Sequence, residues 1–171
     1  MSSTRKSLVI GANGFLGSHV TRLLVERGEN VRVLIRKESN HRALQGLNVE
    51  RRYGDIFDEQ AVHDAIQDRS VVYYCVVDTR AWLRDPAPLF RTNVDGLRKV
   101  LDIAVRFPLH RFVFTSTIGT IARREDGFVT EKEPFNWGEL GGAYIQSRVA
   151  AETLVLKYCA EQKLPAVIMC V

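Results

Sequence analysis

The 171-residue sequence is poor in cysteine, has no long apolar run and contains no cluster of basic residues. Its three cysteines, Cys75, Cys159 and Cys170, lie outside any CxxC or Cys/His pattern and do not suit a disulfide framework, so we expect structural roles for them. No apolar stretch approaches the roughly 18 residues of a membrane-spanning helix, so we expect a cytoplasmic protein outside the membrane.

Charge and histidine exclude two further classes of protein. The formal net charge is only +4, with no Lys/Arg run and no interleaved aromatic residues, which argues against nucleic-acid binding. The four histidines share no metal-ligand spacing, so we expect no metal site. A phosphorylated small molecule is the expected partner.

Short β-branched runs alternate with helical patterns along the whole chain. Several runs are almost wholly apolar, as strands covered on both faces should be. The six expected strands are residues 7–10, 31–35, 49–53, 71–77, 111–116 and 166–171. This alternation predicts one doubly wound α/β domain, a parallel sheet of about six strands with helices on both faces.

Apolar stripes predict helices between these strands, and Asp58 is expected to be the N-cap of one of them. In such a sheet the ligand lies at the carboxyl ends of the strands. Residues 118–142 form the longest irregular segment, and we expect them to lie over the site as a loop. Trp82 and Trp137 fall in loop-like regions near the expected mouth of the site. Core packing, contact with a lid and substrate stacking all stay open as their roles.

The stretch "GANGFLG" places Gly11, Gly14 and Gly17 between the first strand and the first helix. Glycine allows a tight turn and lets backbone N–H groups approach a phosphate at the helix N-terminus. The alternative is a simple turn and capping pattern, which the strand-turn-helix context disfavours. We therefore predict that this loop, including Asn13, Phe15 and Leu16, binds a dinucleotide.

Residues at the ends of the second and third strands indicate which dinucleotide. Arg36 and Lys37 stand where an acidic residue would hold ribose hydroxyls, and an arginine there pairs with a 2′-phosphate. This favours NADP, with NAD as the second choice. The alternative is that Arg36 and Lys37 are solvated surface charges. Asp55 and Ile56 are expected at the adenine, since a carboxylate accepts from the exocyclic amine and an aliphatic side chain covers the ring; an isolated Asp55 would otherwise form a turn.

The motifs "GANGFLG", "YGDIFD", "TNVDGLRKVL", "RFVFTST" and "YIQSR", in this order, resemble the extended short-chain dehydrogenase/reductase family, the NAD(P)-dependent epimerases and dehydratases. The segment "VVDTRAWLRDP" looks most similar to the branch of dihydroflavonol reductases and hopanoid-associated sugar epimerases. The resemblance covers residues 1–171 as an NAD(P)-binding Rossmann domain. It also implies a smaller C-terminal substrate domain, which the sequence does not contain, and we expect a truncation after the apolar run at Val171.

The resemblance implies roles for individual residues. It makes Thr117, which follows Ser116, the catalytic hydroxyl, makes Tyr144 the catalytic tyrosine, and places Asn93 behind the cofactor site. Three positions depart from the family pattern. The lysine after the tyrosine is Arg148, the small pair lining the cofactor is Val76 and Val77, and the threonine before the first glycine is Ile10.

Chemistry alone also pairs Tyr144 with Arg148, because residues four apart share one face of a helix. A neighbouring cation favours the phenolate form of tyrosine, which makes it a usable acid or base. Arginine supplies that field but does not relay a proton. We expect Tyr144 and Arg148 to contact the cofactor as well, with Arg148 holding its ribose. The alternative places Tyr144 in the core and Arg148 on the surface.

We therefore expect an NADP-dependent oxidoreductase of the epimerase/dehydratase type that transfers hydride to or from a small molecule bearing a hydroxyl or carbonyl group. Two alternatives stay open: a dinucleotide-binding regulatory or interaction module without turnover, and an inactive fragment of such an enzyme. Family resemblance also suggests a homodimer through the helices that carry "NVDG" and "YIQSR", although their apolar stripes fit ordinary packing on the sheet equally well.

Overall fold

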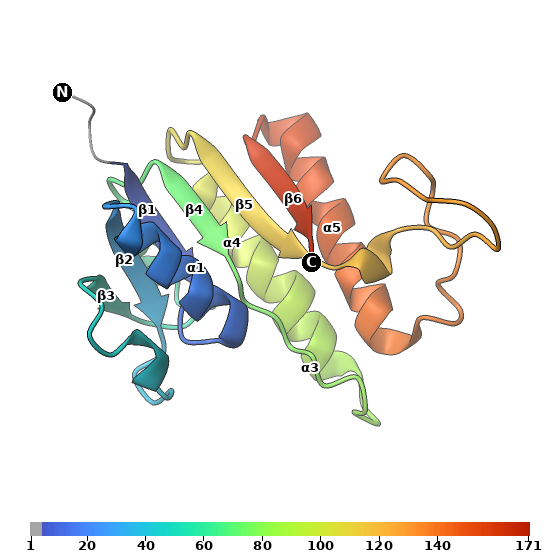
Figure 1. Cartoon of the computed structure of the whole chain (residues 1–171), viewed down its shortest axis with the longest axis horizontal. Coiled ribbons are helices and arrows are strands. Elements are labelled where there is room, and N and C mark those ends of the chain that lie inside the picture. Colours follow the sequence, from blue (N-terminus) through green and yellow to red (C-terminus); the bar gives the residue numbers. More distant parts are fainter. Residues whose placement is uncertain (1–4) are drawn as a thin grey trace.

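The computed structural model describes residues 5–171, in which six parallel strands form one sheet with helices on both faces (Figure 1). The strands are β1 (Lys6–Ile10), β2 (Asn30–Ile35), β3 (Glu50–Tyr53), β4 (Val71–Tyr74), β5 (Arg111–Ser116) and β6 (Ala166–Cys170). The helices are α1 (Phe15–Glu26), α2 (Glu59–Ile66), α3 (Ala87–Phe90), α4 (Leu97–Ala104) and α5 (Gly142–Gln162). Three short helical turns complete the chain: η1 (Arg42–Leu44), η2 (Arg91–Gly96) and η3 (Ile118–Thr120).

The strand order is β3-β2-β1-β4-β5-β6, which confirms the predicted doubly wound sheet. The chain builds outward from β1 to β3, then returns to the other side of β1 and continues through β4 to β6. Connections leaving β1 and β4 therefore diverge at their carboxyl ends. A crevice opens at such a reversal point, and in α/β sheets it is where ligands bind.

Two apolar cores lie on opposite faces of the sheet, because side chains alternate along each strand. Leu8 and Ile10 of β1 pack into the larger core with α2, α4 and α5. Val9, between them, packs into a smaller core with Leu24 of α1. Figure 1 shows α1 in front of the sheet and α4 and α5 behind it.

Strand boundaries agree with the sequence predictions at most positions. The predicted strand 111–116 coincides with β5, and Asp58 caps α2 by accepting from the Ala61 N–H at 3.0 Å. The prediction for residues 71–77 is wrong at its end, since β4 stops at Tyr74. Beyond that residue the chain leaves the ladder and becomes a wall of the crevice described below.

The final strand is covered on one face only. β6 is an edge strand that pairs with β5 alone, and Val167 and Met169 remain 36% and 49% exposed. Their face of the sheet carries no helix over β6 in the described part of the chain (Figure 1). Across residues 5–171, no helix is both long and apolar enough to span a bilayer.

Candidate dinucleotide and catalytic site

The glycine loop after β1 is shaped by contacts that exclude larger side chains. Gly11 has a left-handed φ of +84°, and a Cβ there would lie 3.0 Å from the carbonyl carbon of Cys75 and from Val76 Cγ2. A Cβ on Gly17 would lie 2.2 Å from the Gly11 carbonyl oxygen, because α1 crosses the loop at backbone contact. Both glycines are therefore required for the turn itself.

Gly14 differs from these two glycines, because the backbone geometry tolerates a side chain there. Its φ is −74°, and a Cβ would meet only the Gly11 carbonyl oxygen at 3.4 Å. Gly14 is the N-cap residue of α1, whose first turn contains no acidic residue and receives no side-chain cap. A helix N-terminus of this kind presents free N–H groups and a positive dipole end, which suit a phosphate.

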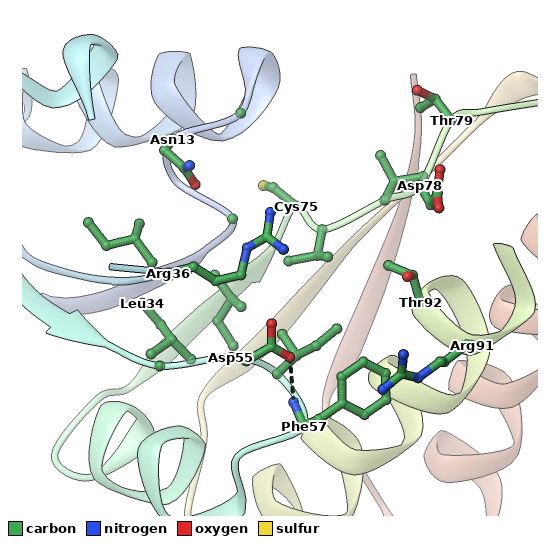
Figure 2. Close-up of a pocket in the computed structure, with 18 of the residues that line it drawn as sticks. Asn13, Leu34, Arg36, Asp55, Phe57, Cys75, Asp78, Thr79, Arg91 and Thr92 are labelled. Atoms are coloured by element: carbon green, nitrogen blue, oxygen red, sulfur yellow. Dashed lines mark hydrogen bonds between the residues drawn. The ribbon is translucent and has the colours of Figure 1, made fainter. Parts of the chain in front are cut away.

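A pocket of about 900 Å³ opens at this loop and extends along the carboxyl ends of β1, β2, β3 and β4 (Figure 2). Its volume lies in the range of cofactor sites. Of the predicted cofactor-binding residues, eight line it: Gly11, Asn13, Gly14, Arg36, Asp55, Ile56, Val76 and Val77. The crevice expected from the strand order thus contains most of the residues selected from the sequence.

Arg36 and Asp55 point into the pocket from the ends of neighbouring strands (Figure 2). The Arg36 guanidinium is exposed and donates to no described residue. One Asp55 oxygen accepts from the Phe57 N–H at 3.0 Å, so Asp55 forms a turn and lines the pocket at the same time. Its other oxygen has no protein partner among residues 5–171. Lys37 is exposed and lies outside the pocket lining.

The opposite wall of the pocket follows β4 and includes residues that were not predicted from the sequence. Asp78 accepts two hydrogen bonds from the Arg80 side chain, at 2.9 Å from Nε and 2.6 Å from Nη2, and a third from the Arg80 backbone N–H at 3.1 Å. These hydrogen bonds lower the pKa of the Asp78 carboxyl, against a smaller opposing effect of burial. Arg91 also lines the pocket, with its guanidinium 4.9 Å from the centre of the Phe57 ring. The pocket is therefore rich in arginine.

Asn93 is fully buried and connects the β4 wall to α5. Its Oδ1 accepts from the Asp78 N–H at 2.7 Å, and its Nδ2 donates to the Asp78 carbonyl at 3.0 Å and to Ser147 Oγ at 2.9 Å. Ser147 Oγ in turn donates to the Tyr144 carbonyl at 2.7 Å. The amide protons of Asn93 are thus fully used within the protein, and Asn93 supports the pocket wall without lining it.

Thr117 and Ser116 follow one another at the end of β5, but their hydroxyls have different partners. Ser116 is buried, and its Oγ donates to Glu152 Oε2 at 2.6 Å. Thr117 caps the turn η3, and its Oγ1 accepts from the Gly119 N–H at 3.2 Å. The Thr117 hydroxyl proton has no acceptor among the described residues, so this hydroxyl can donate to a bound oxygen.

Tyr144 and Arg148 lie one turn apart on α5. Their burial is the opposite of the alternative that placed Tyr144 in the core and Arg148 on the surface. Tyr144 is half-buried, whereas Arg148 is 1% exposed. Nη2 of Arg148 donates to the Thr115 carbonyl at 2.5 Å, and no hydrogen bond joins the guanidinium to the phenol. Burial lowers the pKa of Arg148, and the nearby Tyr144 opposes that shift. The guanidinium therefore faces the β5 backbone.

The remaining predicted residues lie outside the pocket lining. Thr117, Tyr144 and Arg148 belong to the neighbouring β5–α5 side of the crevice, and Asn93 joins this side to the pocket wall. Phe15 is 86% exposed at the start of α1, and Gly17 is buried behind the loop. Leu16 is half-buried. The roles assigned to these residues stay predictions.

Several charged residues of the site were missed because each reads as an ordinary surface charge. Asp78 and Arg80 directly follow the predicted strand 71–77, and that position at a carboxyl end was the available signal. Glu152 stands four residues after Arg148 on the helix face that carries Tyr144. Arg91 had no such signal, because nothing in the residues around it points to the pocket.

Three features define a dinucleotide-binding α/β protein. They are this strand order, a glycine turn at the point where the order reverses, and a pocket of this size. The family model for the NAD dependent epimerase/dehydratase family matches residues 7–171. The chain belongs to this family, which confirms the resemblance seen in the sequence.

Named relatives agree with this assignment. The chain is 35% identical over 146 residues to the sterol demethylase protein B of Methylococcus capsulatus, covering 85% of this chain and 44% of the relative. It is 33% identical over 145 residues to a putative dihydroflavonol 4-reductase of Synechocystis sp., covering 84% of this chain and 42% of the relative. The predicted likeness to dihydroflavonol reductases is thereby confirmed. The chain spans less than half the length of both relatives.

Among solved structures, one short-chain dehydrogenase/reductase superfamily protein from Agrobacterium tumefaciens was crystallised with bound NAD. Its TM-score against this chain is 0.77 at 29% sequence identity, covering 96% of this chain and 48% of that protein. The similarity therefore extends over nearly all of the present fold.

Proposed function

We propose that the chain binds NADP and serves an oxidoreductase, epimerase or dehydratase reaction on a small molecule that bears a hydroxyl or carbonyl group. The observation that carries the proposal is the glycine loop, where Gly11 and Gly17 leave no room for a side chain and α1 begins uncapped at the pocket. This cradle fits a diphosphate. When bound, the nicotinamide supplies the hydride donor or acceptor.

The preference for NADP rests on Arg36. Its guanidinium lines the pocket, has no carboxylate partner among residues 5–171 and carries the planar fork that suits a 2′-phosphate. Asp55 supports the same orientation, because its free carboxylate oxygen can accept from the adenine amine. The family description names NAD, so the choice between the two cofactors is the finer point to be tested.

On the β5–α5 side, the proposal gives each residue one task. Thr117 donates its free hydroxyl proton to the substrate oxygen, and Tyr144 exchanges a proton with that oxygen. Arg148 places its positive charge one helical turn from Tyr144, and no hydrogen bond joins the two side chains. Relatives named as reductases and demethylation proteins favour this reading over a binding module without turnover.

Titration of the intrinsic fluorescence with NADPH and with NADH tests the proposal. We expect tighter binding of NADPH, and Arg36→Gln should reduce that preference by about tenfold or more, the loss of roughly 1.4 kcal/mol or more of charge-assisted hydrogen bonding. Lys37→Gln is the matched control, because Lys37 is exposed outside the pocket. Failure to bind either dinucleotide would remove the proposal, and equal affinities would remove the role of Arg36.

Tyr144→Phe separates an enzyme from a binding module. The variant should keep its affinity for NADPH, because Tyr144 lies outside the pocket lining. Hydride transfer should fall by roughly 100-fold or more, because the acid/base hydroxyl is gone. Undiminished turnover in this variant would assign the proton transfer to another group.

A further inference from the structure

Glu152 lies on α5 two turns beyond Tyr144 and one turn beyond Arg148. Its Oε2 accepts a hydrogen bond from Ser116 Oγ at 2.6 Å and lies 2.8 Å from Thr120 Oγ1. Ser116 precedes Thr117 and Thr120 follows it, so both sides of the Thr117 turn contact one carboxylate oxygen. The contact therefore ties the continuous segment of β5 and η3 to α5, which lies more than 20 residues further along the chain.

The hydroxyl groups of Ser116, Thr117 and Thr120 differ in what accepts their protons. Ser116 uses its only proton on Glu152, and Thr120 Oγ1 lies near both Glu152 and the Thr117 carbonyl, at 2.7 Å from the latter. Thr117 Oγ1 accepts from the Gly119 N–H, and the Thr117 carbonyl also accepts from the Thr120 N–H at 3.1 Å. Thr117 alone therefore keeps a hydroxyl proton that no described residue accepts.

We propose that Glu152 is a positioning residue for Thr117. Its carboxylate holds Ser116 and Thr120 against α5, which fixes the turn between them and sets the Thr117 side chain in one rotamer relative to Tyr144. This inference rests on the proposed function, which gives Thr117 its contact with the substrate oxygen. Glu152 itself stays behind the reacting groups, because its Oε2 is occupied by Ser116 and Thr120.

The χ1 rotamer of Thr117 is the direct readout, and it needs no substrate. We suggest measuring three-bond N–Cγ and C′–Cγ couplings of Thr117 by NMR in the 171-residue chain and its variants. The wild type should show one rotamer. Glu152→Ala should reduce the major rotamer to about half, whereas Glu152→Gln should restore most of it, because the Gln amide oxygen still accepts from Ser116.

Glu161→Gln is the matched control on the same helix, because Glu161 pairs with the exposed Lys157 at 3.9 Å near the end of α5. Its Thr117 couplings should equal those of the wild type. NADPH affinity should stay within about twofold in all variants, since the pocket lining excludes Glu152.

A single Thr117 rotamer in Glu152→Ala, even with a lowered Tm, would overturn the proposal and leave Glu152 a purely structural tie between α5 and β5. If Glu152→Ala does not fold, Ser116→Ala and Thr120→Val remove the same contacts from the other side, and unchanged couplings in both overturn it equally. Loss of the proposed function would show separately, as failure of the wild type to bind either dinucleotide while the rotamer result stands.

Discussion

The guanidinium of Arg148 lies 5.0 Å from the centre of the Phe114 ring. Within residues 5–171 its one hydrogen bond runs from Nη2 to the Thr115 carbonyl: Nε and Nη1 are buried without an acceptor, and no carboxylate lies within ion-pair distance. A buried charge without a counter-ion is costly to the fold. A function of Arg148 that outweighs this cost would explain its presence.

Arg148→Met should therefore raise the free energy of unfolding by about 1 kcal/mol, because methionine keeps much of the length and removes the charge. Arg148→Ala should instead lower it by about 3 kcal/mol through the cavity that it leaves. Urea unfolding measures both changes. The control is Lys157→Met on the same helix, which should stay within about 0.5 kcal/mol because Lys157 is exposed. A destabilised Arg148→Met would show that the cation stabilises the core.

The glycine loop offers a contrast between two substitutions. Gly17→Ala places a methyl group 2.2 Å from the Gly11 carbonyl oxygen, so we expect a loss of about 3 kcal/mol in unfolding free energy. Gly14→Ala has 3.4 Å to the same atom and should fold with nearly the wild-type stability. Because Gly14 lines the pocket, its methyl group should still weaken NADPH binding by roughly tenfold or more. Thermal unfolding together with fluorescence titration distinguishes the two effects.

The sequence predicted the scaffold better than the side-chain partners. The residues of β5 could be predicted because an apolar, β-branched run lies between turn residues, and Asp58 could be predicted as a cap because the capping bond is local. The burial of Arg148 depends on Phe114 and Thr115, which are distant in sequence, and no pattern in the chain places a cation there. No local pattern singles out Glu152 either, because tertiary packing brings the two hydroxyls to it.

Cys75 provides a chemical probe inside the pocket. Burial raises the pKa of its thiol to about 11, with a smaller opposing effect of a hydrogen bond with Thr115. Alkylation of Cys75 by iodoacetamide should therefore accelerate about tenfold per pH unit below this pKa, because only the thiolate reacts. Bound NADPH should slow the reaction at Cys75 and leave Cys159, on α5, unaffected. Mass spectrometry of the alkylated peptides measures both rates, and equal protection of both cysteines would argue against a local effect.

The same pKa shift links Cys75 to stability. The folded thiol keeps its proton to higher pH than the unfolded thiol, so its contribution is complete below the ordinary value of 9.0 and is lost as the pH rises toward about 11. Cys75→Ala should accordingly lose less stability than the wild type across this alkaline range. Urea unfolding at several pH values tests this, and parallel pH profiles would contradict the shift.

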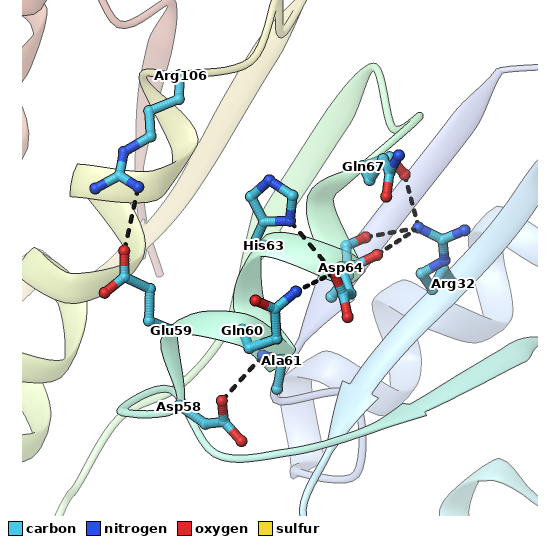
Figure 3. A network of polar contacts seen from close by, with 10 residues as sticks. Arg32, Asp58, Glu59, Gln60, Ala61, His63, Asp64, Gln67 and Arg106 are labelled. Atoms are coloured by element: carbon cyan, nitrogen blue, oxygen red, sulfur yellow. Dashed lines mark hydrogen bonds and ion pairs between the residues drawn. The ribbon is translucent and has the colours of Figure 1, made fainter.

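Arg32 is a strand residue that caps a helix. Its Nη1 lies 3.2, 2.9 and 2.7 Å from the carbonyl oxygens of Asp64, Ala65 and Gln67 at the end of α2, as Figure 3 shows, and its Nε pairs with Glu50 at 2.8 Å. Arg32→Met should lower the free energy of unfolding by about 3 kcal/mol, since buried carbonyls and a paired carboxylate lose their donor. Arg52→Met, which also removes a partner of Glu50 but from an exposed position, should cost less than about 1 kcal/mol.

The effect of Arg32 should also depend on pH. Its hydrogen bond is the main cause that holds the pKa of Glu50 below the ordinary value of 4.5. A carboxyl with a lowered pKa stabilises the fold above its unfolded pKa and loses that contribution as the pH falls through its folded pKa. The difference between wild type and Arg32→Met should therefore shrink below about pH 4.5 but not vanish, because the bonds to the α2 carbonyls do not titrate. A difference that stays constant down to acid unfolding would assign the whole effect to the helix cap.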